Sequence, residues 1–429
     1  MTLTPPEHQG LRWLFLDLNS YFARVEQNER PELRGRPVAV VPMMTDSTCA
    51  IAASPEAKLY GIKTGTPIYD AKKLCPALTC VLARHDVYVD YHHRILKAVD
   101  RILPVHKVWS VDEFDCELMG QQCHFDTAIL LAKRVKQMLR RDVGPCITCS
   151  IGIAPTSFLA KIGTEIQKKD GLTVIRPEDL PDILLPLKLT DLPGINVRME
   201  ERLRRGGVKT VHDLWNTSPK QARALWGGVQ GERFWYWLHG YDVPVPETSR
   251  SMIGHSRVLD PDLRYPEKAR EMTRRLLAKA TTRLRRQKFY ATRLYVSVRC
   301  LDGRKWTTEH QFPAAQDIFT FLEHLDQAWA EMNTRISPSL SRPFFKKVAV
   351  ILHGLSREGY VTSDLFQTET PEGKTRQEKR ARLSAALDTL QDKYQRETVW
   401  LGARPKTQAG HVGTKIAFSR VPDREEFWN

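Results

Sequence analysis

The chain has 429 residues, too many for one ordinary hydrophobic core, so its length predicts two to four domains. It carries 65 Lys and Arg against 50 Asp and Glu, a formal net charge of +15. This balance is typical of proteins that meet a polyanion, although a merely basic soluble surface would give the same count. No apolar run approaches the ~20 residues of a membrane span, and residues 1–10 lack the apolar core of a secretory signal, so we expect a cytoplasmic protein with no membrane partner.

In chain order, the first part of the sequence predicts alternating strands and helices. Residues 12–18 predict a buried strand, and the helix that follows at about 20–27 is expected to use Ser20 or Asn19 as its cap. The other elements expected here are strands at 37–42 and 48–53, a helix at 55–60, a hairpin strand at 108–118, a helix at 126–141, a strand at 147–154 and a helix at 156–168.

The eight cysteines are dispersed along the chain, which indicates reduced thiols. Cys146 and Cys149 have C-x-x-C spacing, but the run Cys-Ile-Thr-Cys-Ser-Ile-Gly-Ile predicts a buried strand. Because no second pair lies at zinc spacing, we favour structural thiols over a metal or redox site.

The chain changes character after residue 190. Short helices with Pro-Gly and Gly-Gly turns over 190–240 predict a small helical domain, and two prolines mark 241–249 as a linker. The order beyond it, β-α-β-β-α-β, predicts a compact two-layer unit. Its expected elements are strand 251–258, helix 266–287, strand 291–300, strand 304–312, helix 315–336 and strand 345–354.

The C-terminal part gives weaker signals. Residues 356–375 are expected to be flexible, and residues 395–429 predict no function. Residues 376–394 predict one last helix. Its apolar face is expected to comprise Leu383, Ala386, Leu387 and Leu390.

Two acidic positions suggest chemistry. Asp17 lies in the apolar strand Leu-Asp-Leu, and Asp112 and Glu113 lie in Trp-Ser-Val-Asp-Glu-Phe-Asp. Carboxylates among Leu and Phe are unfavourable unless they are paired or bind a cation, and two such strands side by side would bring them together. Hard oxygen ligands suit Mg²⁺, and a two-metal site suits phosphoryl transfer. For either position alone, a strand-end acid facing solvent is an equally good interpretation.

Several motifs in fixed order resemble the Y family of DNA polymerases, the lesion-tolerant class. The first signature is at 16–26 (LDLNSYFARVE) and the second at 110–114 (SVDEF). Between them, 52–65 (AASPEAKLYGIKTG) resembles the fingers, and 150–161 (SIGIAPTSFLAK) continues the likeness. The Glu-Ala-Lys form of the fingers segment is typical of the UmuC-like members.

The resemblance implies an α+β multidomain, right-hand polymerase. It comprises a ferredoxin-like palm, small fingers, a helical thumb with a helix-hairpin-helix, and a β-α-β-β-α-β little finger. The implied boundaries are palm 1–27 and 75–175, fingers 28–74, thumb 176–240, linker 241–249, little finger 250–355 and C-terminal tail 356–429. The implied activity is template-directed addition of dNTPs to a primer, in low-fidelity translesion synthesis and SOS-type DNA repair.

The same resemblance implies a metal site. Asp17 and Asp112 would each bind both of two Mg²⁺ ions. Glu113 would bind only the catalytic ion, and the carbonyl of Leu18 would bind only the nucleotide-bound ion. Phe22 would be the steric gate that excludes a 2′-hydroxyl, unless it is a plain core residue of its helix.

Other residues are implied to bind the nucleotide, namely Tyr21, Ser54, Lys58 and Lys168. Lys58 stands where the family commonly has Arg. A single ammonium therefore replaces a planar, bidentate guanidinium, and phosphate binding is expected to be weaker. Pro55 replaces a common aromatic, and Lys168-Lys169-Asp170 replaces the usual Lys-Pro-Asn. Lys168 could equally be a solvated helix end.

DNA contacts are expected in two places. Leu192 to Asn196 resembles the thumb loop whose backbone amides bind a phosphate, with Gly194 at its centre and Asn196 in place of a second glycine. In the little finger, Leu294, Val296 and Val298 should face the helices. The outward residues expected to contact DNA are Arg293, Tyr295, Arg299 and Arg304. The many Lys and Arg of helix 266–287 are interpreted mainly as a solvated face.

Partners follow from the resemblance too. Leu365 and Phe366, in Ser-Asp-Leu-Phe, resemble the short peptide that binds a sliding clamp, although Thr362 replaces its usual Gln. The expected partners are primer-template DNA, dNTPs and the clamp. Whether a UmuD-like dimer and a recombinase filament are also needed stays open. The rival hypotheses are a non-catalytic polymerase-like scaffold at damaged DNA, a nucleotide cyclase and a simple DNA-binding module.

Overall fold

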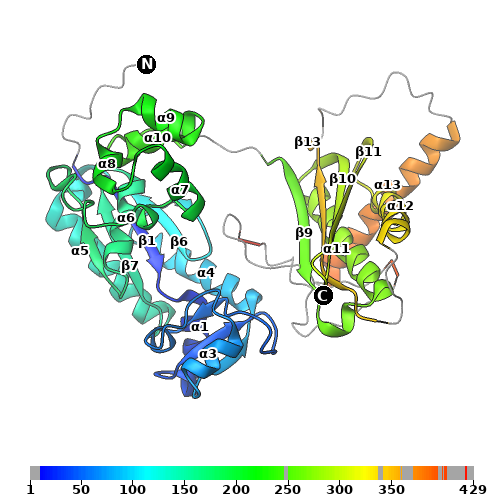
Figure 1. Ribbon diagram of the computed structural model, residues 1–429, viewed down its shortest axis with the longest axis horizontal. Helices are drawn as coiled ribbons and strands as arrows, with labels where there is room; N and C mark the ends of the chain where they lie inside the picture. Colours follow the sequence, from blue (N-terminus) through cyan, green and yellow to red (C-terminus); the bar gives the residue numbers. More distant parts are fainter. Residues whose placement is uncertain are drawn as a thin grey trace. The chain divides into compact units, whose positions relative to one another are not determined.

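The computed structural model describes residues 10–245, 250–336, 342–357, 359, 371–394, 399, 401–402 and 421–422. The chain divides into two compact units, the first comprising residues 1–246 and 416–421 and the second residues 247–415 and 422–429 (Figure 1). Each unit has its own hydrophobic core. In the described part of the chain, no helix is long and apolar enough to span a bilayer.

A five-stranded sheet forms the centre of the first unit. β1 (Trp13–Leu18) lies between β6 (Glu113–Glu117) and β7 (Cys149–Ala154) and is antiparallel to both. β5 (Val105–Val108) and β8 (Leu172–Val174) complete the order β5-β6-β1-β7-β8. Every residue of β1 is buried, which explains why its sequence is a nearly continuous apolar run.

Helices cover both faces of this sheet. Leu14 and Leu16 of β1 belong to a core cluster with residues of α4 and α5. Trp13 and Phe15 alternate to the other face and pack in a second cluster with residues of α6. The three helices are α4 (His85–Val99), α5 (Phe125–Met138) and α6 (Ser157–Ile166).

The segment from Val108 to Leu118 is not the single hairpin strand that its alternation predicted. β5 ends at Val108 and β6 begins only at Glu113. Between them, the N–H groups of Trp109 and Ser110 both donate to the carbonyl of Glu113, at 2.9 and 3.1 Å, and close a tight turn. This turn carries Asp112.

A smaller three-stranded sheet, in the order β3-β2-β4, follows the first helix. The strand expected at 48–53 is shorter and comprises Ala52–Ala53, because Cys49 and Ala50 pair with Pro67 and Thr66 instead of with β2. Ser20 is at the N-cap position of the first helix, but at φ 50° its side chain caps nothing. The elements here are α1 (Tyr21–Glu29), β2 (Val38–Val41), β3 (Ala52–Ala53), α2 (Pro55–Lys58), α3 (Ile68–Leu74) and β4 (Thr79–Leu82).

Four short helices end the first unit. The side chains of Asn196, Thr210 and Ser218 cap three of them by accepting a backbone N–H. Their apolar residues pack in the same cluster as Trp13 and Phe15, so this helical segment rests on the α6 face of the sheet. The helices are α7 (Val197–Arg205), α8 (Val211–Trp215), α9 (Pro219–Trp226) and α10 (Val229–Leu238).

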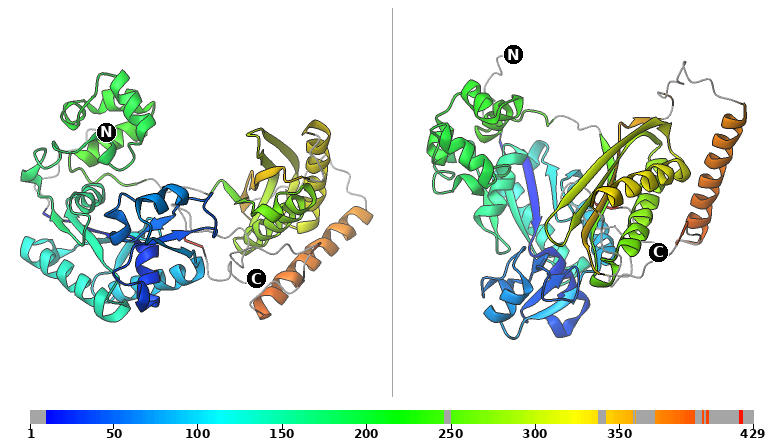
Figure 2. Two further views of the ribbon diagram at one scale, coloured as in Figure 1. Left: turned by 60° about the horizontal axis from the view of Figure 1, so that its bottom comes forward. Right: turned by 45° about the vertical axis from the view of Figure 1, so that its right-hand side comes forward.

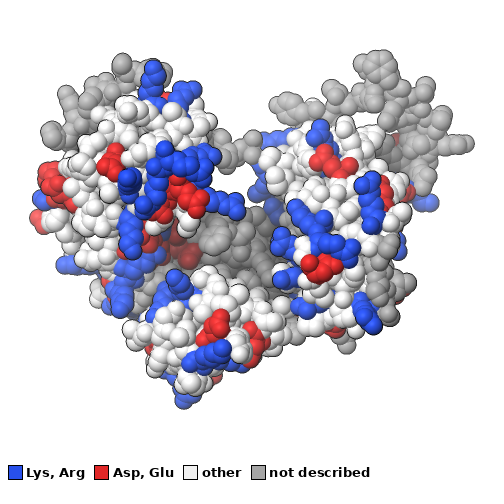
Figure 3. Space-filling view, viewed as in Figure 1, with Lys and Arg blue, Asp and Glu red and all other residues white. Residues whose placement is uncertain are grey.

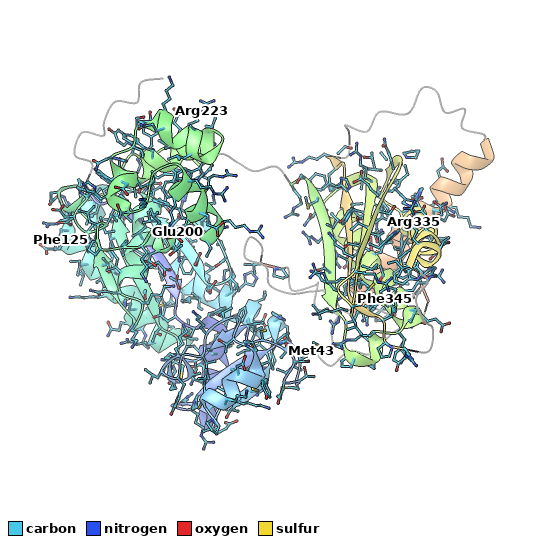
Figure 4. All side chains as sticks on the ribbon, in the orientation of Figure 1. Met43, Phe125, Glu200, Arg223, Arg335 and Phe345 are labelled. Atoms are coloured by element: carbon cyan, nitrogen blue, oxygen red, sulfur yellow. The ribbon has the colours of Figure 1, made fainter. Side chains whose placement is uncertain are left out.

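The second unit has the predicted element order β-α-β-β-α-β. Its antiparallel sheet runs β11-β10-β12-β9, and two long helices cover one face of it (Figure 2). Phe345, labelled in Figure 4, is fully buried and belongs to the core cluster between sheet and helices. The elements are β9 (Met252–Val258), α11 (Pro266–Arg286), β10 (Phe289–Cys300), β11 (Lys305–Ala315), α12 (Ile318–Ile336) and β12 (Phe345–His353).

The C-terminal segment differs from expectation in two ways. Ser356–Arg357, predicted to be flexible, form a short strand β13 that pairs with β10. The last helix, α13 (Pro371–Tyr394), does not pack through its predicted leucine face, because Leu383 and Leu390 are exposed. Polar contacts hold it instead, including Arg285 Nε of α11 to Asp388 at 2.6 Å.

Candidate active site

The register of the central sheet brings the acidic residues together. Asp17 of β1 lies directly opposite Glu113 of β6, and the N–H of Leu18 donates to the carbonyl of Asp112 at 2.8 Å. Two segments almost a hundred residues apart in sequence therefore place three carboxylates at one end of the sheet, as the strand pattern predicted. Asp17 is buried, at 8% exposure.

A lysine from α6 lies among these carboxylates. Lys161 Nζ is 2.6 Å from Asp17 Oδ2, 2.7 Å from Glu113 Oε1 and 3.2 Å from Glu165 Oε1. Burial lowers the pKa of Lys161, but Asp17 and Glu113 outweigh that effect and hold the pKa above its ordinary value. The sequence interpretation gave Lys161 and Glu165 no role. A charged residue within the apolar run Ser-Phe-Leu-Ala-Lys-Ile was the signal available.

Asp112 is held differently from its neighbours. Ser110 Oγ donates to Asp112 Oδ1 at 2.6 Å. Burial raises the pKa of Asp112 to about 6, the Ser110 hydrogen bond opposes this rise, and the nearby Asp17 and Glu113 add to it. The site therefore concentrates negative charge that water does not fully solvate, which favours a bound cation.

The donor set fits Mg²⁺ in its chemistry, since all three side chains offer hard carboxylate oxygens. Within the described residues, however, no three Asp, Glu, His or Cys side chains already surround a common point. The reason lies in the contacts above. An ammonium group stands between Asp17 and Glu113, and Asp112 is bonded to Ser110.

The two aromatic residues that open α1 have different surroundings. Phe22 is half-buried and stacks on Tyr88 with ring centroids 4.4 Å apart and planes 12° apart. Tyr21 is buried, and its hydroxyl donates to the carbonyl of Tyr88 at 2.7 Å. The Tyr21 side chain is thus a core residue, which argues against the nucleotide contact that the resemblance implied for it.

The predicted phosphate-binding residues also separate into two kinds. Lys58 and Lys168 are exposed, and they are close enough that Lys168 lowers the pKa of Lys58, after the larger effect of partial burial. Lys168 Nζ is bonded to Glu165 Oε2 at 2.6 Å. Ser54 is fully buried, accepts the N–H groups of Val38 and Ala57, and caps α2, so its hydroxyl is structural.

In the helical segment, Gly194 has a φ of 90°, a conformation that favours glycine. Asn196 is extended, with φ −90°, and its side chain accepts the N–H of Met199 at 2.9 Å. Asn196, which stands in place of a second glycine, therefore does not adopt a left-handed conformation. It acts as an N-cap.

On β10 the predicted alternation is confirmed. Leu294, Val296 and Val298 are buried, whereas Arg293 and Arg299 are exposed on the other face. Tyr295 is half-buried there. Arg304 is bonded to Asp302 at 2.7 Å in the adjoining turn.

Basic side chains appear on the surfaces of both units in Figure 3. On α11, Arg270 and Arg274 bind Asp326 of α12, at 2.9 and 2.7 Å. Several of the helix cations thus join the helices to one another, which corrects their interpretation as a merely solvated face. The clamp-like residues Leu365 and Phe366 lie outside the described residues.

Cys149 is buried in β7, and burial raises the pKa of its thiol to about 12. A thiol with this pKa stays protonated at neutral pH, which suits a core residue rather than a nucleophile.

The fold is shared with polymerases of known structure. A Y-family DNA polymerase chimera of Dbh and Dpo4 superposes with a TM-score of 0.68 at 23% identity, over 81% of this chain and 100% of that one. An insertion ternary complex of Dbh DNA polymerase gives a TM-score of 0.53 over the same shares. The fold, with carboxylates at one end of the first sheet and a β-α-β-β-α-β second unit, is therefore that of a DNA polymerase.

Sequence comparison identifies the family. Residues 16–165 match the impB/mucB/samB family, and residues 250–365 match that family's C-terminal domain. DNA polymerase IV of Moorella thermoacetica is 34% identical over 393 residues, 89% of this chain and 93% of that protein. DNA polymerase IV 1 of Bacillus subtilis is 29% identical, over 72% and 76%.

The chain belongs to the Y family of DNA polymerases, the class that performs translesion synthesis. The predicted family, α+β multidomain fold and enzyme class are confirmed. Membership of the UmuC-like subgroup stays a prediction, since the relatives above carry the name DNA polymerase IV.

Proposed function

We propose that this chain extends a DNA primer along a template by nucleotidyl transfer at Asp17, Asp112 and Glu113. In that reaction the primer 3′-hydroxyl attacks the α-phosphorus of a dNTP, and pyrophosphate leaves. The observation that carries the proposal is the register that sets Asp17 against Glu113, with Asp112 in the adjoining turn. Polymerases of this family use divalent metal ions, and three carboxylates at one sheet end supply the ligands that such ions need.

Two Mg²⁺ ions, when bound, would stabilise the charge that develops on the attacking and leaving oxygens. Asp17 and Asp112 would hold both ions, Glu113 one of them, and the Leu18 carbonyl the other. Asp17 is buried and Asp112 is partly buried, and this reduced access to water strengthens each of these interactions.

The nucleotide would lie between Phe22 and the cations Lys58 and Lys168. Phe22 stacks on Tyr88 and is held from below, so its exposed edge can exclude a 2′-hydroxyl. Lys58 and Lys168 would bind the triphosphate as point charges. Both are exposed, and their electrostatic interaction indicates that they face a common region.

We further infer that the first unit comprises palm (1–27 and 75–175), fingers (28–74) and thumb (176–240), and that residues 250–355 form the little finger. Arg293, Tyr295, Arg299 and Arg304 would contact the DNA backbone, with the Gly194 loop holding a further phosphate. A sliding clamp is the partner proposed for Leu365 and Phe366.

Primer extension on an undamaged template with dNTPs and Mg²⁺ tests the proposal. The Asp112→Ala/Glu113→Ala variant should lose extension, because the metal ligands are gone. Glu117→Gln is the matched control, since it removes a carboxylate from the same strand and face, where it pairs with Arg12. Extension by both the native chain and the double variant would refute the site. No extension by the native chain, even with clamp and UmuD-like partners, would favour a non-catalytic scaffold.

A further inference from the structure

Five charged groups form a continuous row from the acidic site outward along α6 and just past its C-terminal end. Asp17 and Glu113 bind Lys161, at 2.6 and 2.7 Å. Lys161 also contacts Glu165 at 3.2 Å, one helical turn further on. The other oxygen of Glu165 binds Lys168, at 2.6 Å. Negative and positive groups therefore alternate, and the last lysine is exposed.

The position of Lys161 conflicts with metal binding. Its ammonium lies on one oxygen of Asp17 and one oxygen of Glu113, so it competes with a divalent ion for both carboxylates. Two cations at contact distance from the same carboxylates repel each other strongly in a partly buried site. Lys161 in this position therefore weakens metal binding at these carboxylates, and its departure would strengthen it.

Glu165 offers Lys161 another partner within reach. In the present arrangement Glu165 shares its charge between Lys161 and Lys168. Burial raises the pKa of Glu165, but the two lysines outweigh it and keep the carboxylate ionised. If a phosphate group drew Lys168 away, Glu165 could bind Lys161 alone, and Asp17 and Glu113 would be released.

We propose that Lys161, Glu165 and Lys168 form an ion-pair exchange that couples phosphate binding at Lys168 to metal binding at Asp17 and Glu113. Without nucleotide, Lys161 occupies the carboxylates and weakens metal binding. With a triphosphate on Lys168, Glu165 takes up Lys161 and the metal site opens. Lys161 and Glu165 are thus positioning residues. The inference rests on the proposed metal site at Asp17, Asp112 and Glu113.

Binding of Mn²⁺ to the full-length chain, without DNA or nucleotide, tests this by electron paramagnetic resonance of the free ion. Lys161→Met should tighten binding about tenfold, because a competing cation is removed. Glu165→Gln should weaken binding, because Lys161 then has no second partner. If Lys161 and Glu165 merely supported the fold, both Lys161→Met and Glu165→Gln would weaken Mn²⁺ binding.

A double-variant cycle separates the exchange from simple loss of charge. If Glu165 acts through Lys161, Glu165→Gln should have little effect once Lys161 is Met. An equal effect in both backgrounds would overturn the exchange. Lys136→Gln is the matched control, since Lys136 pairs with Asp170 at 3.0 Å, apart from these carboxylates, and its removal should leave Mn²⁺ affinity unchanged.

The two proposals fail in different ways. If Asp112→Ala/Glu113→Ala does not abolish the Mn²⁺ site, the metal site itself is wrong and the exchange falls with it. If that variant does abolish it but Lys161→Met and Glu165→Gln shift affinity in the same direction, only the exchange is wrong. Should Lys161→Met fail to fold, Lys168→Gln replaces it. It should tighten Mn²⁺ binding in the native background and not beside Glu165→Gln.

Discussion

At the scale of single residues, the partners of each side chain decide what it can do. Tyr21 and Phe22 are adjacent in sequence, yet their surroundings differ. The Tyr21 hydroxyl is hydrogen-bonded inside the core, whereas the Phe22 ring keeps an exposed edge. Ser54 and Lys58 differ likewise, because one caps a helix and the other reaches solvent. Sequence position alone did not separate these pairs.

Phe22 should control sugar selection. We expect Phe22→Ala to reduce the preference for dNTP over rNTP by about tenfold or more, since the clash with the 2′-hydroxyl disappears. The ratio of kcat/KM for the two substrates measures it. Tyr21→Phe is the matched control and should leave the ratio unchanged, because the Tyr21 hydroxyl binds a core carbonyl. An unchanged ratio in Phe22→Ala would remove Phe22 from the gate.

His92 should make stability depend on pH. Its Nδ1 donates to the carbonyl of Val111 at 2.7 Å, and burial lowers its pKa from 6.5 to about 4. The unfolded chain therefore binds the proton first, so this contribution to stability is present above pH 6.5 and is lost as the pH falls toward 4. The whole effect is at most about 3 kcal/mol.

Urea unfolding at a series of pH values measures this contribution. The His92→Asn variant should show a flatter fall of the unfolding free energy between these two pH values than the native chain does. Asp112, whose pKa is raised, changes stability in the opposite sense in both proteins and cancels in the comparison. Identical slopes would mean that His92 does not carry the effect.

At the scale of elements, ion pairs change the charge that a strand face offers to DNA. On the outward face of β10 and β11, Glu309 lies opposite Tyr295 and binds Arg293 at 3.5 Å and His353 of β12 at 3.1 Å. The proposed DNA-binding face thus includes an acid that already pairs with Arg293. A phosphate must compete with Glu309 for Arg293.

Glu309→Gln should strengthen DNA binding about threefold to tenfold and steepen its dependence on salt, because Arg293 becomes available to phosphate. Titration of labelled duplex DNA at several salt concentrations would show it. Glu331→Gln provides the comparison, since Glu331 is an exposed acid of α12 that pairs with His310. Equal gains in both variants would indicate an effect of net charge alone.

At the scale of the whole molecule, the two units have separate hydrophobic cores. The clusters around β1 and around β10 share no residue, which agrees with the prediction from chain length of more than one domain. The acidic site lies wholly within the first unit. The β-α-β-β-α-β sheet lies wholly within the second.

Phe345→Ala should therefore destabilise the second unit by about 3–5 kcal/mol, the usual range for removing a fully buried ring. In calorimetry, one of two unfolding transitions should move to lower temperature while the other stays in place. The exposed Phe125, seen at the surface of the first unit in Figure 4, is the control, and Phe125→Ala should move neither. A shift of both transitions with Phe345→Ala would mean that the units unfold together.

The sequence by itself determined the family, the element order of the second unit and the acidic residues. These features depend on local patterns, namely apolar strands, helical periodicity and short motifs, each contained within a dozen residues. The predicted alternation of β10 is correct for the same reason, since a two-residue period needs no knowledge of distant segments. The leucine face of α13 was predicted by the same logic and is wrong, because ion pairs with other helices set its orientation.

Only the tertiary structure decided which charges meet. Lys161 is 144 residues from Asp17 and 48 from Glu113, and strand register and the packing of α6 bring the three together. Pairing over such distances depends on how whole elements pack, so a local pattern cannot encode it. The sequence thus predicted the carboxylates of the site, whereas the pairing of Lys161 with them depends on how α6 packs against the sheet.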